Sequence, residues 1–294
     1  MNMDQIEKIK RLAIIAMFSD DDLMDMLVLK GGNALDIVYD IDQRASLDLD
    51  FSIQTEFKPN DIDMIESKMK KALTVLFNEN GYTVFDLKFI LCLDEDAPGI
   101  PPFWGGYRLE FKVIENTQFV KFSHNQRSLR ANAIDIGPGS KKTYRIEISK
   151  WEYCKTKRRT EIDDYTVYVY TPEMIVLEKL RAICQQMPKY SDLIGKSFRK
   201  ARARDFFDIY TTIEHFLIDL TKAENLQLLK DIFEAKKVPI DLITRIKNYR
   251  EYHRPDFSMV EDTVKRNVRL KKFDFYFDYV VNKCDDLAKA LGII

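Results

Sequence analysis

The fold is decided by two short segments, Leu29-Lys30-Gly31-Gly32-Asn33 and Ser46-Leu47-Asp48-Leu49-Asp50-Phe51. A short apolar run leads into the glycine pair, and residues 34–39, with apolar side chains at helical spacing, follow it. In the second segment the period of two predicts a strand whose leucine and phenylalanine side chains point one way, and Asp48 and Asp50 the other. The order therefore predicts a glycine turn, a helix and a strand with two carboxylates on one face.

These parts are chemically complementary. Two neighbouring carboxylates repel each other, and a divalent cation is the usual remedy. Mg²⁺ (or Mn²⁺) takes oxygen ligands and completes its shell with substrate phosphates. The glycine pair lets backbone N–H groups approach phosphates, and a helix starting at Asn33 would point its N-terminus at them. The alternative is a plain glycine turn followed by a strand edge with two solvated aspartates.

The glycine pair, helix and Asp-x-Asp strand resemble the polymerase-β nucleotidyltransferase superfamily. More narrowly, Arg44-x-Ser46-x-Asp48-x-Asp50-Phe51 is similar to the AbiEii/AbiGii toxin family of abortive-infection and toxin–antitoxin systems. The resemblance implies an α+β fold, in which a polymerase-β-like mixed sheet flanked by helices is followed by a helical bundle domain.

Composition limits the function classes. The chain has 294 residues, of which 46% are hydrophobic and 32% charged, so we expect a full core rather than disorder. The net charge of −1 argues against nucleic-acid binding over the whole surface and leaves room for a local basic patch.

Cysteine and histidine spacing excludes a zinc site of the usual kind. The four cysteines form no Cys-x-x-Cys pair, and there are three histidines and no His-Glu-x-x-His motif. The N-terminus has no basic stretch leading into an apolar one, and no apolar run approaches the length of a membrane span. We therefore expect a cytoplasmic protein without a membrane partner.

The pattern of elements changes near residue 170. Thr171-Pro172-Glu173 is typical of a helix start, and almost everything after it is helical in pattern. The sequence predicts a nucleotidyltransferase α/β domain over 1–170 and a helical domain that completes the active site over 171–294. In the first part we expect helices over 4–19 and 59–80, and strands over 82–93, 107–114, 143–149 and 166–170.

Polymerase-β-like enzymes carry a third carboxylate on a strand next to the Asp-x-Asp strand. By resemblance Glu147, in the alternating segment 143–149, is the candidate for a third metal ligand. Glu110 is its competitor. An outward-facing strand glutamate without a chemical role is the alternative for both.

A second group of charged residues lies in the helical part. Leu177-Glu178-Lys179-Leu180 and Arg204-Asp205-Phe206-Phe207-Asp208 resemble the AbiEii segments that complete the active site. Three-residue spacing places Asp205 and Asp208 on one helix face. The alternative is a pair of surface helices joined by ordinary ion pairs, each worth little.

The resemblance implies an Mg²⁺-dependent nucleotidyltransferase toxin that transfers NMP from an NTP to an RNA, with tRNA as the expected acceptor, and releases pyrophosphate. It also implies a cognate antitoxin that keeps the enzyme silent. The expected catalytic residues are Asp48, Asp50, Lys179 and Asp205. The expected metal ligands are Asp48, Asp50 and Glu147. The expected nucleotide-binding residues are Gly31, Gly32, Asn33, Arg44, Ser46, Lys179, Arg204 and Asp208.

Three other functions remain open at this point. The same chemistry would serve nucleotide transfer to a protein hydroxyl. A catalytically inactive nucleotide- or RNA-binding protein would keep the fold, and the chain would also fit a partner-binding subunit.

Overall fold

The computed structural model describes residues 3–41, 48–92, 101–136, 141–195, 200–265 and 268–294. Within these ranges seven strands form one mixed sheet, and all of them precede Tyr170. The strands are β1 (Val28–Lys30), β2 (Leu49–Ser52), β3 (Tyr82–Cys92), β4 (Gly106–Glu115), β5 (Tyr144–Ser149), β6 (Arg158–Ile162) and β7 (Tyr165–Val169). Their order across the sheet is β3-β4-β5-β2-β1-β7-β6. The α+β class predicted from the sequence is confirmed.

Helices are found in both parts of the chain. Up to Tyr170 they are α1 (Met3–Phe18), α2 (Asp21–Met26), α3 (Gly31–Asn33), α4 (Ile62–Glu79), α5 (Asn116–Phe122) and α6 (Gln126–Ala131). From Pro172 they are α7 (Pro172–Cys184), α8 (Pro188–Ile194), α9 (Ala203–Phe216), α10 (Ala223–Ala235), α11 (Arg250–His253), α12 (Ser258–Thr263) and α13 (Phe273–Ala290). The described part of the chain also contains a π-helical turn, η1 (Ala34–Val38), and three 3₁₀ segments, η2 (Pro59–Asp61), η3 (Ile240–Tyr249) and η4 (Arg254–Phe257).

One face of the sheet packs against α1 and α4. Phe51 of β2 lies 5.8 Å from Phe18 of α1, and Phe111 of β4 lies 6.0 Å from Phe77 of α4, measured between ring centroids. All four rings are buried. Because side chains alternate along a strand, the opposite face of β2 is left for Asp50.

The strand register places charged residues side by side on that second face. Asp50 of β2 pairs with Lys30 of β1 on one side and with Glu147 of β5 on the other. Glu147 in turn lies opposite Arg108 of β4. Residues directly opposite each other in neighbouring strands share a face, so these four side chains form one row across the sheet.

Local signals explain where the helices begin. The Asp20 carboxylate accepts from the N–H groups of Asp22 and Leu23 at the start of α2. The Thr171 hydroxyl accepts from the Met174 N–H, and Pro172 takes the first position of α7. The helix expected to begin at Asn33 begins two residues earlier, at Gly31.

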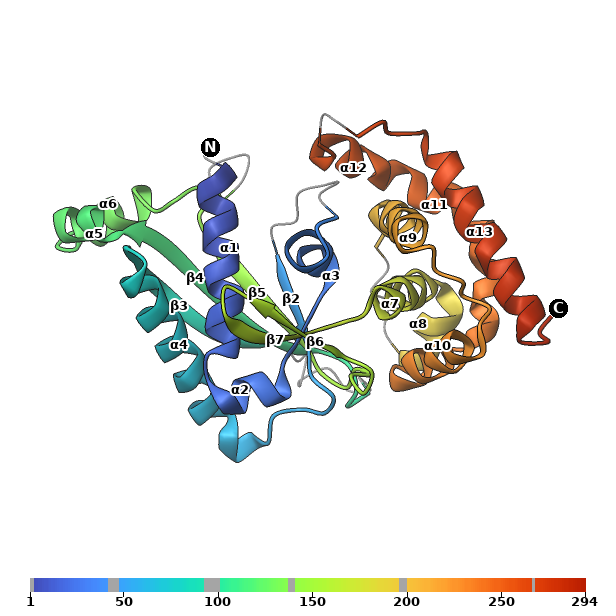
Figure 1. The fold of residues 1–294 in the computed structure, drawn as a ribbon, viewed down its shortest axis with the longest axis horizontal. Coiled ribbons are helices and arrows are strands. Elements are labelled where there is room, and N and C mark those ends of the chain that lie inside the picture. The colour runs from blue at the N-terminus through green and yellow to red at the C-terminus, as the bar shows by residue number, and fades with distance from the viewer. Residues whose placement is uncertain (1–2, 42–47, 93–100, 137–140, 196–199, 266–267) are drawn as a thin grey trace.

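We call residues up to Tyr170 the N-terminal part and those from Pro172 the C-terminal helices; that this division is a domain boundary stays a prediction. The two lie next to each other in Figure 1. Aromatic pairs join them: Tyr39 and Phe216 have ring centroids 5.5 Å apart, and Trp104 and Tyr190 5.9 Å. None of the helices in the described ranges is long and apolar enough to cross a membrane.

Candidate active site

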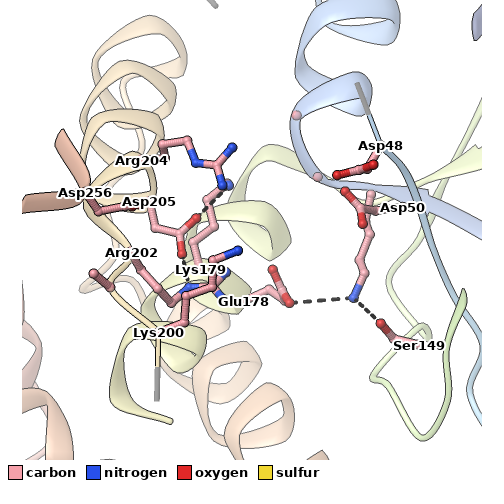
Figure 2. A pocket seen from close by; sticks show the side chains of 14 residues that line it. Asp48, Asp50, Ser149, Glu178, Lys179, Lys200, Arg202, Arg204, Asp205 and Asp256 are labelled. Atoms are coloured by element: carbon pink, nitrogen blue, oxygen red, sulfur yellow. Dashed lines mark hydrogen bonds and ion pairs between the residues drawn. The ribbon is translucent and has the colours of Figure 1, made fainter. Parts of the chain in front are cut away.

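A pocket lies between the N-terminal part and the C-terminal helices. Figure 2 shows Asp48 and Asp50 on one side of it, basic side chains of the C-terminal helices on the other, and Glu178 between them. The lining residues are Lys30, Gly31, Gly32, Asp48, Asp50, Ser149, Glu178, Lys179, Lys200, Ala201, Arg202, Arg204, Asp205 and Asp256.

The glycine pair and the aspartate strand meet directly. Gly31 has a φ of +74°, and a Cβ at this position would lie 2.7 Å from Oδ2 of Asp50. The missing side chain therefore lets the Asp50 carboxylate lie against the glycine backbone. Behind this contact, Asn33 donates from Nδ2 to the Asp48 carbonyl at 2.6 Å and accepts from Lys10 at 3.0 Å. Asn33 thus fixes the entry to β2 and is not among the lining residues.

Electrostatics on this side favour a bound cation. Burial raises the pKa of Asp50 to about 7, and the neighbouring carboxylates Glu147 and Asp48 act in the same direction, while Lys30 opposes them. Lys30 therefore balances the negative charge of ionised Asp50 only in part, and a bound cation would stabilise this charge.

The other side of the pocket is built on α7 and α9. Lys179 donates to Oδ1 of Asp205 at 3.1 Å and to Oδ2 of Asp208 at 2.7 Å, and all three side chains are buried. Arg202 also donates to Asp205. Burial alone would raise the pKa of Asp205, but Arg202 and Lys179 outweigh it, and the pKa is lowered. Asp205 is therefore held ionised between two cations.

The start of α9 is fixed by residues far along the chain. The Arg202 N–H donates to Nδ1 of His253 at 3.1 Å, and the Ala203 N–H donates to Oδ2 of Asp256 at 3.0 Å. Burial lowers the pKa of His253 to about 4, so the ring stays neutral and accepts at neutral pH. These contacts hold the basic residues at the pocket edge.

Most of the predicted site residues meet in this pocket. The lining contains Gly31, Gly32, Asp48, Asp50, Lys179, Arg204 and Asp205. Asn33 and Asp208 lie behind the lining, where they hold Asp48 and Lys179. Arg44 and Ser46 lie outside the described residues. The chemical roles assigned to all of these residues stay predictions.

Glu147 of β5 and Glu110 of β4 each form an ion pair with an arginine of the other strand. Glu147 is next to Asp50 in register, but its carboxylate contacts Arg108 at 3.1 Å and does not line the pocket. Glu110 pairs with Arg145 at 3.1 Å. Across the described ranges, no group of three or more His, Cys, Asp or Glu residues is placed to hold a metal ion. Both contacts of Arg108 go to Oε1 of Glu147, and a metal role for Glu147 stays a prediction.

The structure adds pocket residues that the sequence analysis did not assign. They are Lys30, Ser149, Glu178, Lys200, Ala201, Arg202 and Asp256. A signal was available for Lys30, which directly precedes the glycine pair, and for Glu178, which directly precedes Lys179. Asp256 comes from η4, more than fifty residues beyond Asp205, and nothing in the local sequence distinguishes it.

Comparisons with known proteins identify the family of this chain. A crystal structure from Helicobacter pylori, named as that of a putative nucleotidyltransferase, has 17% identity and a TM-score of 0.48, covering 99% of this chain and 98% of that one. JHP933 from Helicobacter pylori has 19% identity and a TM-score of 0.47, covering 98% and 92%. No curated protein sequence is significantly similar. The family model "Nucleotidyl transferase AbiEii toxin, Type IV TA system" matches residues 13–279. The chain therefore belongs to the AbiEii family of toxin nucleotidyltransferases, as its glycine and aspartate motifs predicted.

Proposed function

We propose that this enzyme transfers a nucleoside monophosphate from an NTP to an RNA hydroxyl, with tRNA as the expected acceptor, and releases pyrophosphate. The observation that carries the proposal is the pocket itself. Two carboxylates and a glycine turn on the N-terminal part face a lysine and two arginines on the C-terminal helices. This arrangement suits a substrate with a metal-bound triphosphate.

The carboxylates fit a magnesium ion. Asp48 is exposed, and Asp50 is partly buried and undercompensated, with both on the same pocket wall. Mg²⁺ is commonly held by one or two carboxylates together with substrate phosphates, so two ligands are enough. When bound, the ion would neutralise charge that develops on the phosphoryl oxygens.

In transfer, the acceptor hydroxyl releases its proton to solvent, and its oxygen bonds to the α-phosphorus while the bond to the oxygen bridging the α- and β-phosphates breaks. Pyrophosphate carries away the electron pair. Lys179, Arg202 and Arg204 are placed to bind its negative charge. Gly31 and Gly32 line the pocket and have no side chains of their own, so their backbone N–H groups can approach the triphosphate closely.

Asp205 acts as an orienting group for Lys179 in this proposal. The lowered pKa of Asp205 makes it a weak proton acceptor, which speaks against a role as general base. Its contacts to Lys179 and Arg202 instead hold two cations in fixed positions at the pocket.

The choice of an RNA acceptor is supported by the family and by local charge. Lys200 is exposed at the pocket edge next to Arg202 and Arg204, and an RNA backbone is bound largely through phosphate contacts of this kind. A cognate antitoxin is the protein partner that the toxin family implies.

The test is transfer of label from each of the four α-labelled NTPs, with Mg²⁺, to total bacterial RNA. We expect an RNA band that disappears with Asp50→Asn, with Lys179→Met and on chelation of Mg²⁺. Lys189→Met is the matched control, because Lys189 is exposed and pairs with Asp241 at 2.7 Å away from the pocket. Label in a protein band in place of an RNA band would show that the acceptor is a protein. Absence of label from both would refute the activity.

A further inference from the structure

Lys30 is a buried lysine at the floor of the pocket. Its side chain is 9% exposed, and its ammonium donates to the Ser149 hydroxyl at 3.2 Å. The same nitrogen lies 3.6 Å from a carboxylate oxygen of Glu178 and 3.6 Å from one of Glu152. One ammonium thus contacts β5, the loop after β5 and helix α7.

Through these contacts Lys30 is connected to residues on both sides of the pocket. Lys30 pairs with Asp50 in the strand register, and the next residue is Gly31, which touches the Asp50 carboxylate. Glu178 directly precedes Lys179 on α7. The Lys30–Glu178 ion pair therefore joins β1, the strand next to the one that carries Asp50, to helix α7, which carries Lys179.

Glu178 and Glu152 are themselves held by a buried arginine. Arg181 donates to Glu152 at 2.8 Å and to Glu178 at 3.2 Å, and Lys236 lies 3.7 Å from Glu152. Although burial works against its charge, Glu152 and Glu178 raise the pKa of Lys30, so it is a cation. Buried ion pairs often add little stability compared with apolar packing, and their best-attested value is to fix one geometry.

We propose that Lys30 is a positioning residue, which sets the distance between the carboxylate wall and the basic wall of the pocket through Glu178. For its catalytic readout the inference rests on the proposed transferase function. Both walls must contact one triphosphate in the transition state, and a misplacement of about 1 Å can cost ~100-fold in rate.

Replacing Lys30 by methionine keeps a long side chain and removes the charge. We expect Lys30→Met to lower kcat by roughly 10- to 100-fold with KM for the NTP within about threefold, because each wall still binds its part of the substrate. The matched control is Lys150→Met. Lys150 is equally buried, but its ammonium pairs with Glu56 at 2.9 Å inside the N-terminal part. This control should keep the parental kcat.

A double-mutant cycle tests whether Lys30 acts through Glu178. If it does, Lys30→Met combined with Glu178→Gln should be no more than about twofold slower than the slower single variant. If the losses of kcat in the two single variants multiply in the double variant, the two residues act independently and the inference is overturned. A parental kcat in Lys30→Met would also overturn it.

A distance measurement separates this inference from the proposed function. Spin labels at Val120→Cys and Leu193→Cys, both exposed, report the placement of α5 relative to α8 in a Cys92→Ser background, since the other three cysteines are buried. We expect the distance distribution to broaden with Lys30→Met and to stay parental with Lys150→Met. An unchanged distribution in Lys30→Met would overturn positioning, whether or not the parent transfers label.

Discussion

The contact between Gly31 and Asp50 can be tested by adding one methyl group. Gly31→Ala places a Cβ 2.7 Å from Oδ2 of Asp50, whereas ordinary contact begins at 3.4 Å. The carboxylate must therefore move by about 0.7 Å, or the glycine backbone must move away from it. Either movement changes the place where Asp50 would meet a metal-bound phosphate.

The methyl group also has a backbone cost, which a second glycine measures separately. Gly31 and Gly81 have φ angles of +74° and +86°, where an alanine costs about 1–2 kcal/mol. A Cβ at Gly81 meets nothing within 4 Å. Gly81→Ala therefore carries the backbone strain without the contact to Asp50.

We expect both variants to lose about 1–2 kcal/mol of unfolding free energy in urea denaturation. Only Gly31→Ala should lose activity, by roughly 100-fold in kcat, since a misplacement of about 1 Å in a reacting geometry costs that much. Label transfer under saturating NTP is the assay. Equal kcat in the two alanine variants would refute the reasoning, because the contact with Asp50 would then have no catalytic consequence.

Three further predictions concern charge. Asp50→Asn should lower kcat/KM at least ~10³-fold and raise the Mg²⁺ concentration needed for half-maximal transfer, as measured by Mg²⁺ titration. Lys179→Met leaves Asp205 and Asp208 buried without their shared cation, so unfolding free energy in urea should fall by ~3–5 kcal/mol; a loss under ~1 kcal/mol would contradict this. The pKa of His253 is about 4 in the fold against an ordinary 6.5, so the unfolded chain binds more protons between these values and stability falls as pH falls. Between pH 7 and pH 5 the parent should lose about 2 kcal/mol more than His253→Gln, measured by denaturation at both pH values.

Hydrophobic periodicity and helix-capping residues were enough to predict the strand and helices that carry the pocket residues. The alternation around Asp50 gave β2 and the direction of its carboxylate, and Thr171 and Pro172 gave the start of α7. Three-residue spacing placed Asp205 and Asp208 on one face of α9, where both contact Lys179. These features depend on residues close together in the chain, so the local sequence pattern is enough to predict them.

Features that depend on distant residues were not predictable in the same way. The short helices α5 and α6 were missed, since helices of this length depend on packing more than on their own sequence. Strand β6 was also missed, since Ile162 is the one apolar residue among its five. Arg108 was not expected beside Glu147, because it is supplied by a neighbouring strand whose register is set by the whole sheet. Asp256 reaches the pocket through the packing of η4 against the start of α9.

The charges of the pocket explain why metal and nucleotide should bind together. On the basic wall Lys179 and Arg202 already contact Asp205, so a free triphosphate has to compete with an internal anion. On the other wall Asp50 is undercompensated and repels the same triphosphate. A metal-bound triphosphate brings a cation to Asp50 and an anion to the arginines in one step. We therefore predict that each ligand raises the affinity of the site for the other, and by linkage the gain is the same in both directions.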